Sequence, residues 1–533
     1  MKNLFLLFSL FLVTTTSLSA QLTPGVTTAG GNAIGEAYLI NDIISLKKHG
    51  FLVIQSIALE EHNLIELQIF NLKRTLTNIQ SIKIGHDKGE LRIQGFTEFN
   101  DNFLLFLSLY QENTRKNELY LYEFNLPDLK LAKKVKIEET YSPSTLNIPF
   151  FYAVSPDKSK LLLSSWSYAI PKDFAQLSNK IFNKDLLVIK EDSYAFPYEN
   201  RELYIDNNLV DNAGNTYIIG KKHAASTVNN YDYLSQLRGN SFILAFFEEK
   251  KDPNLYEIDI KKHTFPLLKF KIDSQQDLVG IGFYKKGAKK NFAGTSVFKL
   301  NPSSKELKMN NTEIDKTDFI DALGETYPKY DTSPSAFSQA SIIEVVAKEK
   351  AYFLVGEMVK LEVETVMPVN FYGGYGFSTN SNRNRSFQYT SDHSLLDMFI
   401  IKMDLKGNIL WMKRIPKQQI LDKENAPYFS FSVIERDRDL LLFYNDHPGN
   451  FKIEHKQKLK NSDIRSAVPM LAKVSCSSGK IKKRKLSSLF GKNALIRPYF
   501  CKKLDDNKVF MYGQNKKRKL ETYRMKIANL GGS

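Results

Sequence analysis

Short apolar runs separated by polar turns recur along the whole chain. Runs such as 51–58 (FLVIQSIA), 102–110 (NFLLFLSLY) and 351–359 (AYFLVGEMV) have the length of single strands. Helical periodicity is scarce, and its best candidate is the segment 316–326 with Thr317 as a cap. The pattern therefore predicts a chain built almost entirely of β-strands.

A polar turn between two of these strands recurs eight times, at intervals of 52 to 89 residues. In chain order the turns are KKHG, FNDN, SPDKSK, DNAGN, SQQD, AKEK, RDRD and LDDN. A third strand and a second polar turn follow in several units, as in DMFIIKMDLKGN. Repeats of four antiparallel strands at this spacing are typical of a β-propeller. We therefore predict one all-β propeller domain over 35–530 with eight blades. Seven blades, or a pair of packed β-sandwich domains, are the alternatives.

The last unit contains only three clear strands. We expect the missing fourth strand to come from 35–40 (GEAYLI), so that the N-terminal strand closes the last blade. Such closure removes the open edges of the sheet.

The first twenty residues have the features of a secretory signal peptide. Lys2 is followed by an apolar block over 4–13 and by a small residue at Ala20. The block is too short for a membrane span, which takes about 20 residues. We therefore predict a signal peptide over 1–20, a flexible leader over 21–34 and no transmembrane segment. The mature protein is expected in the periplasm, on the cell surface or outside the cell.

The chain contains two cysteines, Cys476 and Cys501. Export permits a disulfide, but two cysteines do not make a disulfide scaffold in a chain of this length. The expected blade layout places them on strands that are not neighbours, which favours two free thiols.

Positive charge is concentrated at the C-terminal end. The segment 471–533 contains 17 Lys and Arg against 3 Asp and Glu, so it carries +14 of the net +16. Docking on an anionic envelope surface is one interpretation, and a solvated edge strand protected by lysines is the other. Nucleic acid is not an expected partner of an exported chain. The docking candidates are Lys482, Lys483, Arg484, Lys485, Lys516, Lys517, Arg518 and Lys519.

Several of these segments resemble one group of proteins when they are read together. DNAGNTYIIGKKH, LKGNILWMKRIPKQQ and LLFYNDHPGN are similar to the repeat units of uncharacterised secreted β-propeller proteins of Bacteroidota. The resemblance covers most of the mature chain. It implies the fold and no particular chemistry.

Five long connections distinguish one side of the predicted blades. They are 168–184, 221–240, 315–337, 367–393 and 445–466. All are expected where a second strand joins a third or where one blade joins the next. Binding residues usually lie on such loops of a rigid scaffold. The candidate ligand-binding residues are His223, Tyr231, Tyr233, Phe371, Tyr372, Tyr375, Phe387, Tyr389, Asp446 and His447.

No sequence motif indicates a particular reaction. The GxSxG, P-loop and Rossmann patterns are missing from the sequence. No metal site and no cofactor are predicted, because the histidines show no ligand spacing. We expect a monomeric, non-enzymatic protein that binds a protein or a glycan through its loops. The alternative is a propeller enzyme acting on glycans or small esters, with carboxylates such as Asp392 and Asp446, or a metal, at its funnel.

Overall fold

The apolar runs form antiparallel β-strands throughout the described part of the chain. The computed structural model describes residues 38–529 apart from several short and long segments. The segments that it leaves out are 47–48, 59–62, 85–89, 112, 127, 142–149, 168–173, 201, 223–240, 249–251, 259–262, 287–291, 315–339, 362–392, 422–427, 454–458, 491–493, 506–507 and 516–522.

The strands form eight antiparallel sheets, which we number as blades 1 to 8 in chain order. The chain divides into two compact units. The larger unit consists of Gly85–Lys423 and Lys452–Leu459, and it holds blades 2 to 6. The smaller unit consists of Met1–Ile84, Glu424–Phe451 and Lys460–Ser533, and it holds blades 1, 7 and 8.

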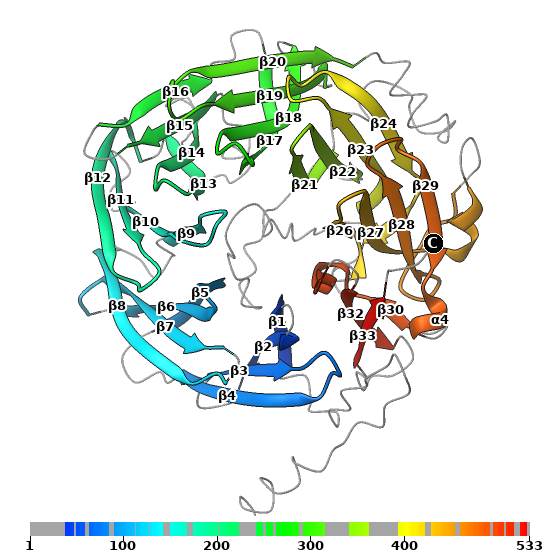
Figure 1. The fold of residues 1–533 in the computed structure, drawn as a ribbon, viewed down its shortest axis with the longest axis horizontal. Coiled ribbons are helices and arrows are strands. Elements are labelled where there is room, and N and C mark those ends of the chain that lie inside the picture. Colours follow the sequence, from blue (N-terminus) through cyan, green and yellow to red (C-terminus); the bar gives the residue numbers. More distant parts are fainter. Residues whose placement is uncertain are drawn as a thin grey trace, which may run out of the picture. The chain divides into compact units, whose positions relative to one another are not determined.

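Within the larger unit, the sheets follow one another in chain order (Figure 1). Blades 2 and 3 contain β5 (Glu90–Phe99), β6 (Asn102–Gln111), β7 (Lys116–Asn125), β8 (Leu131–Tyr141), β9 (Phe150–Val154), β10 (Leu161–Ser167), β11 (Phe174–Phe182) and β12 (Val188–Glu199). Blades 4 and 5 contain β13 (Leu203–Val210), β14 (Thr216–Lys222), β15 (Ser241–Phe247), β16 (Asn254–Ile258), β17 (His263–Ile272), β18 (Leu278–Lys286), β19 (Gly294–Leu300) and β20 (Leu307–Glu313). Blade 6 contains β21 (Ala340–Lys348), β22 (Ala351–Leu361), β23 (His393–Met403), β24 (Ile409–Ile415) and β25 (Gln419–Leu421).

The smaller unit combines the first blade with the last two. Blade 1 contains β1 (Tyr38–Ser45), β2 (Phe51–Ala58), β3 (Asn63–Phe70) and β4 (Leu76–Ile84). Blade 7 contains β26 (Phe431–Glu435), β27 (Asp439–Asp446), the 3₁₀ helix η5 (Pro448–Lys452), β28 (Val468–Ser475) and β29 (Ile481–Lys485). Blade 8 contains β30 (Ala494–Ile496), η6 (Pro498–Phe500), β31 (Lys502–Lys503), β32 (Lys508–Asn515) and β33 (Tyr523–Asn529), and the short helix α4 (Ser487–Phe490) precedes it.

All eight predicted turns lie between the first and second strands of a blade. KKHG lies between β1 and β2, DNAGN between β13 and β14, and LDDN between β31 and β32. In blade 8 the first strand is divided into β30 and β31, which pair with different parts of the second strand β32. The all-β class, the β-propeller fold and the count of eight blades are thereby confirmed.

The predicted role of the N-terminal strand is wrong. β1 is the first strand of blade 1, and it pairs with β2 from Tyr38↔Ile57 to Ser45↔Phe51. In blade 8, the described strands that pair with β32 are β30, β31 and β33. Blades 1 and 8 instead meet through side chains, because the rings of Phe51 and Phe510 lie 4.3 Å apart within one buried cluster.

The predicted loop 168–184 is also wrong over most of its length. Phe174–Phe182 forms β11, the third strand of blade 3, and it pairs with β10 from Leu161↔Phe182 to Ser167↔Gln176. The burial of β11 alternates, with Ala175 and Leu177 inside, as in a strand between two others. A buried Asn179 interrupts the apolar alternation, which made the segment read as a loop.

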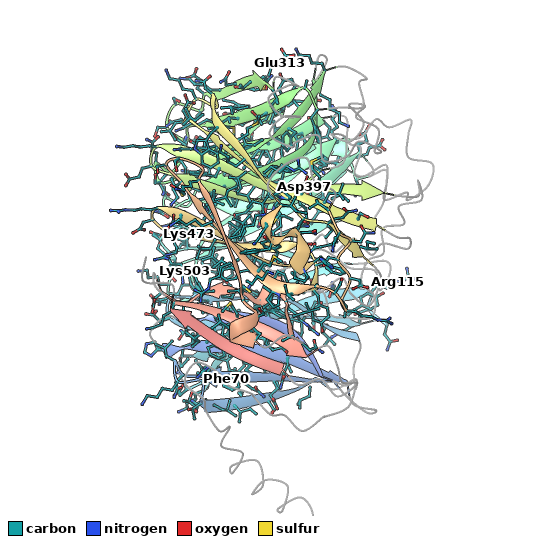
Figure 2. All side chains as sticks on the ribbon, turned by 90° about the vertical axis from the view of Figure 1, so that its right-hand side faces the viewer. Phe70, Arg115, Glu313, Asp397, Lys473 and Lys503 are labelled. Atoms are coloured by element: carbon teal, nitrogen blue, oxygen red, sulfur yellow. The ribbon has the colours of Figure 1, made fainter. Side chains whose placement is uncertain are left out.

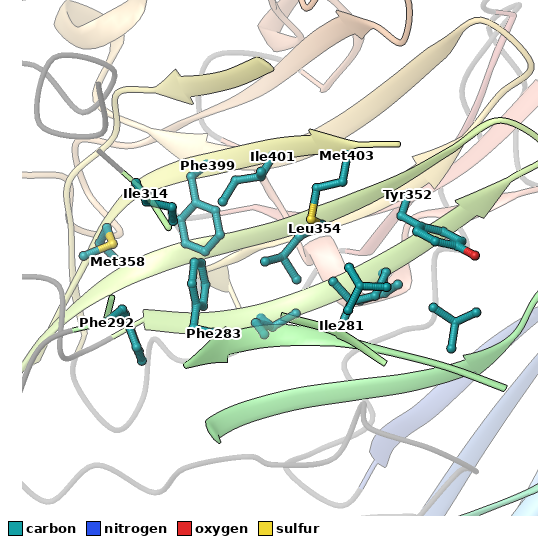
Figure 3. Close-up of a cluster of buried hydrophobic side chains, with 14 residues drawn as sticks. Ile281, Phe283, Phe292, Ile314, Tyr352, Leu354, Met358, Phe399, Ile401 and Met403 are labelled. Carbon is teal, nitrogen blue, oxygen red and sulfur yellow. The ribbon is translucent and has the colours of Figure 1, made fainter. Parts of the chain in front are cut away.

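The core consists of apolar layers between adjacent blades. Between blades 5 and 6, Phe283 of β18 stacks on Phe292 at 4.8 Å and meets Phe399 of β23 edge-on at 5.7 Å (Figure 3). Middle strands such as β18 are buried on both faces, whereas the fourth strand β20 has no fully buried residue. This layering explains the continuous apolar runs of the second strands.

Both cysteines are buried, and they form no disulfide with each other, as the blade layout predicted. Burial raises the pKa of the Cys501 thiol to about 12. The predicted helix at 316–326 lies outside the described residues.

Candidate functional site

Most of the predicted ligand-binding residues lie in connections outside the described residues. The connection between β14 and β15 spans 223–240, the one between β22 and β23 spans 362–392, and the link from β20 to β21 includes 315–339. We call the side of a blade where its second strand joins its third the loop side. The predicted site residues that lie outside the described residues are His223, Tyr231, Tyr233, Phe371, Tyr372, Tyr375, Phe387, Tyr389 and Asp392, together with Lys516, Lys517, Arg518 and Lys519 of the basic end.

The loop of blade 7 is largely described, and Asp446 anchors it. Asp446 ends β27 and is 1% exposed. Its Oδ1 accepts a hydrogen bond from Asn450 Nδ2 at 3.1 Å. Asn450 Nδ2 also donates to the Lys460 carbonyl at 2.8 Å, and Asn450 Oδ1 accepts from the Lys460 N–H at 2.9 Å. Through these contacts, the buried Asp446 holds the described part of the blade 7 loop in place.

His447 follows Asp446 and is half-buried in a basic environment. Its Nδ1 accepts a hydrogen bond from the Gly449 N–H at 2.9 Å, so a neutral ring carries its proton on Nε2. Burial lowers the pKa of His447, and the cations Lys460 and Lys485 lower it further, against an opposing effect of Asp463. These effects favour the neutral form of the His447 imidazole.

The basic strand β29 and the blade 7 loop, which were separate candidates in the sequence, are in contact in the structure. Lys485 ends the basic strand β29, and its Nζ lies 5.1 Å from the centre of the Phe451 ring in the blade 7 loop. Lys482 and Arg484 are the exposed positions of β29, while Lys483 and Lys485 are half-buried. The basic strand therefore ends against the loop that holds His447.

The fourth strand of blade 2, β8, contains glutamates as well as lysines. On β8, Lys136 pairs with Glu118 at 3.1 Å and with Glu139 at 2.9 Å. On β29 four of the five residues are basic and none is acidic. Among the described residues, no carboxylate forms an ion pair with Lys482, Arg484 or Lys485. The outer strand of blade 7 thus presents uncompensated positive charge.

A buried network of charges lies at the loop side of blade 6. Lys417 Nζ contacts Glu357 Oε2 at 2.8 Å and Gln419 Oε1 at 2.9 Å. Arg414 forms an ion pair with Asp397, whose Oδ1 also accepts from the Lys417 N–H at 3.1 Å. The four charged side chains are at most 3% exposed. Asp397 lies among the strands of the larger unit, whereas the exposed Glu313 stands at its periphery (Figure 2).

This network fixes the two strand ends that flank the connection 362–392. Glu357 lies near the end of β22, Asp397 lies near the start of β23, and β25 pairs with β23 at His393↔Leu421. Burial raises the pKa of Asp397 to about 6, although Arg414 opposes the shift. These residues were not among those predicted from the sequence. Their signal was a charge inside each of two apolar strand runs, Glu357 in LVGEMV and Asp397 in LLDMFI.

Two further properties concern the described residues alone. Within them, no group of three or more His, Cys, Asp and Glu side chains is placed to hold a metal ion. None of their helices is long and apolar enough to cross a membrane.

Comparison with known proteins finds similarity in fold only. No family model and no curated protein matches the chain. Among solved structures, the β-propeller domain of the trilobed protease from Pyrococcus furiosus is 12% identical, with a TM-score of 0.35 over 84% of this chain and 98% of that chain. The Synechocystis apocarotenoid oxygenase with cobalt is 8% identical, with a TM-score of 0.33 over 96% of this chain and 92% of that one. A DUF4221 member from Bacteroides vulgatus is 9% identical, with a TM-score of 0.28 over 75% of this chain and 98% of that chain.

Proposed function

We propose that the protein is an exported, monomeric, non-enzymatic β-propeller that binds a protein or a glycan through the loop side of its blades. The buried network of blade 6 is the observation that carries this proposal. Buried charge pairs contribute little net stability, because removing charges from water costs about as much as the pairing returns. They do hold attached segments in one geometry, and binding loops need a rigid base.

The same observation favours binding over the alternative of a propeller enzyme. A general acid or base must reach the substrate within hydrogen-bond distance. Asp397, Glu357 and Asp446 are each at most 2% exposed, and each has a polar partner inside the protein. These buried carboxylates are suited to holding the ends of the strands in place, and they are not suited to contact with a substrate.

Loop replacement tests this function. In one variant 367–392 is replaced by a short Gly-Ser linker, and a panel of neutral and acidic polysaccharides is screened by affinity electrophoresis. We expect the parent chain to be retarded by at least one polysaccharide and the variant to migrate freely. Single alanine substitutions at Phe371, Tyr372, Tyr375, Phe387 and Tyr389 then identify the contacts, because aromatic rings stack on sugars.

The matched control shortens a turn at the opposite end of a blade. Residues 301–306 join β19 to β20, and a linker there leaves the loop side intact. Retardation that survives replacement of 367–392 but is lost in the control would place the binding surface elsewhere and contradict the proposal.

The basic strand β29 supports a second role, docking on an anionic lipid surface. Lys482, Arg484 and Lys485 form no ion pairs among the described residues, and such charge attracts anionic lipid headgroups by about 1 kcal/mol per cation. We expect glutamine at these three positions to reduce sedimentation with phosphatidylglycerol vesicles at low salt. Glutamine at Lys133, Lys134 and Lys136 of β8 is the matched control. Equal losses of vesicle binding in both triple variants would show that net charge alone causes the binding, and they would contradict docking by β29.

A further inference from the structure

Three segments of blade 7 come together at the loop that follows β27. The first contains His447, Gly449 and Asn450, the second begins at Lys460, and the third is the end of β29 at Lys485. All of these residues belong to the smaller unit. Among the described residues, no carboxylate forms an ion pair with Lys460 or Lys485. The loop therefore gathers two cations that are not neutralised.

Asn450 and Gly449 bring the first two segments together. The Asn450 side chain is 1% exposed, and it forms two hydrogen bonds with the Lys460 backbone, at 2.8 Å and 2.9 Å. A Cβ on Gly449 would lie only 2.9 Å from His447 Nδ1 and 3.1 Å from Lys460 Cδ. The imidazole and the lysine side chain therefore both pack against this glycine. The loop backbone holds them next to each other.

Lys485 approaches the same place from β29. Its Nζ lies 5.1 Å from the centre of the Phe451 ring in the loop. Burial lowers the pKa of His447, and the positive charges of Lys460 and Lys485 lower it further. Both ammonium groups therefore lie close enough to the imidazole to repel its protonated form.

The three side chains offer hydrogen-bond donors that a ligand can reach. Nδ1 of His447 accepts a backbone hydrogen bond, so the neutral ring keeps its N–H at Nε2. Lys460 is exposed, and His447 and Lys485 are half-buried. Asp463 is the carboxylate that faces His447, and its Oδ1 accepts hydrogen bonds from the Ser466 N–H and hydroxyl at 2.7 Å each. That oxygen of Asp463 is engaged in its own turn.

We propose that His447, Lys460 and Lys485 form a phosphate-binding site, in which the imidazole Nε2–H and the two ammonium groups contact the oxygens of one phosphate group. Neighbouring ammonium groups repel each other, and a phosphate dianion offsets this repulsion more fully than a carboxylate with a single charge. The site goes beyond the docking proposed for β29, because it takes a free phosphate as well as the phosphate of a lipid headgroup.

Nuclear magnetic resonance of the full chain with ¹³C-labelled histidine tests the site with inorganic phosphate as the probe. The signals are followed between about pH 5 and 8 in phosphate, acetate and chloride at equal ionic strength, and His447→Gln assigns the signal of interest. We expect phosphate to raise the pKa of His447 by about one unit relative to chloride, because a bound anion stabilises the imidazolium. Acetate should have a smaller effect. The signals of His49 and His263, which lie in other blades, are the internal controls.

Single variants separate the donors of the site from net charge. Lys460→Gln and Lys485→Gln should each weaken phosphate binding about tenfold, the value of one charged hydrogen bond. Lys482→Gln removes the same charge near the opposite end of β29 and should weaken binding less than about twofold. Equal losses in Lys482→Gln and Lys485→Gln would overturn the site. A pKa of His447 that is the same in all three salts would also overturn it.

Vesicles distinguish the two sources of the phosphate. Phosphatidic acid presents a phosphomonoester, whereas phosphatidylglycerol presents a phosphodiester. A preference for phosphatidic acid that Lys460→Gln abolishes would assign the site to a lipid headgroup, and a response to inorganic phosphate without this preference would assign it to free phosphate. A chain that sediments with vesicles but whose His447 ignores phosphate would contradict the site alone. A chain whose His447 responds but that does not sediment would contradict only the docking by β29.

Discussion

Individual buried charges are the most unusual residues of the larger unit. Lys417 is 0% exposed and depends on Glu357 and Gln419 for its contacts. Replacing Lys417 by Met leaves the Glu357 carboxylate buried without its cation. We expect this change to lower the free energy of unfolding by about 3–5 kcal/mol, measured by chemical denaturation.

Two variants check the cause of that loss. Lys413→Met on β24, four residues before Lys417, changes a half-exposed lysine and should alter the stability by less than about 0.5 kcal/mol. Adding Glu357→Gln to Lys417→Met should restore part of the stability, since no buried charge then lacks a partner. A double variant as unstable as the sum of both single variants would contradict the ion-pair explanation.

The stability contributed by Asp397 should depend on pH. Its folded-state pKa of about 6 is raised above the ordinary value of 3.8, so the native state binds the proton more tightly than the unfolded state. Its favourable contribution is therefore complete below about pH 4 and is lost as the pH rises to about 6. We expect the wild type to gain stability relative to Asp397→Asn as the pH falls from 7 to 4. A difference independent of pH would place the pKa of Asp397 outside this window.

The residues of the site were only partly predictable from the sequence. Asp446 and His447 could be assigned to a loop because NDHPGN follows an apolar strand. The burial of Asp446 and the approach of Lys485 to Phe451 depend on how two distant strands pair, which no local pattern encodes. Glu357 and Asp397 were visible as charges in apolar runs, but only the sheet register shows that they meet Lys417 and Arg414.

Turns are the elements that repeat most regularly, and Asp211 shows how one is built. Its carboxylate accepts hydrogen bonds from the Gly214 N–H, the Asn215 N–H, Asn215 Nδ2 and Tyr217 Oη. Gly214 adopts a positive φ of 94°, which favours glycine. The segment DNAGN therefore shapes the turn between β13 and β14 through its own hydrogen bonds.

Asp211→Ala should destabilise the protein by about 2–3 kcal/mol, because the change leaves a buried tyrosine hydroxyl and two N–H groups without this acceptor. Asp404→Ala is the matched control. Asp404 caps its turn by bonds to the Lys406 and Asn408 N–H groups, but it is more exposed and binds no tyrosine. We expect a loss of about 1 kcal/mol there by thermal unfolding. A larger loss for Asp404→Ala would contradict this account of the turn.

Among the strands and turns, the sequence predicted the features that depend on neighbouring residues, and it did not predict those that depend on how the strands pair. Each of the eight polar turns identified the boundary between a first and a second strand. Seven of them contain Gly, Asp or Asn, which adopt turn conformations readily. β11, the third strand of blade 3, was not predicted because it contains a buried polar residue, Asn179. The Oδ1 atom of Asn179 accepts a hydrogen bond from the Ser164 hydroxyl at 2.7 Å. A buried polar partner of this kind cannot be identified before the strands are paired.

For the whole molecule, the first and last blades are joined by packing between side chains. Phe51 stacks on Phe70 of its own blade and contacts Phe510 of blade 8. Phe510→Ala should lower the stability by about 3–5 kcal/mol through the cavity it leaves. Phe174→Ala, at a position 60% exposed, should have little effect.

A truncation that removes 21–37 but keeps β1 should leave the melting temperature unchanged. A large loss of stability in that truncation would contradict this expectation.

We propose that the propeller binds its ligand at the loop side without converting it. The most direct measurement is a calorimetric titration with the ligand identified by loop replacement, followed by mass spectrometry of the recovered ligand. We predict a saturable isotherm that disappears when 367–392 is replaced, and a ligand recovered chemically unchanged. Recovery of a cleaved or modified ligand, or an isotherm unaffected by the loop replacement, would contradict the account.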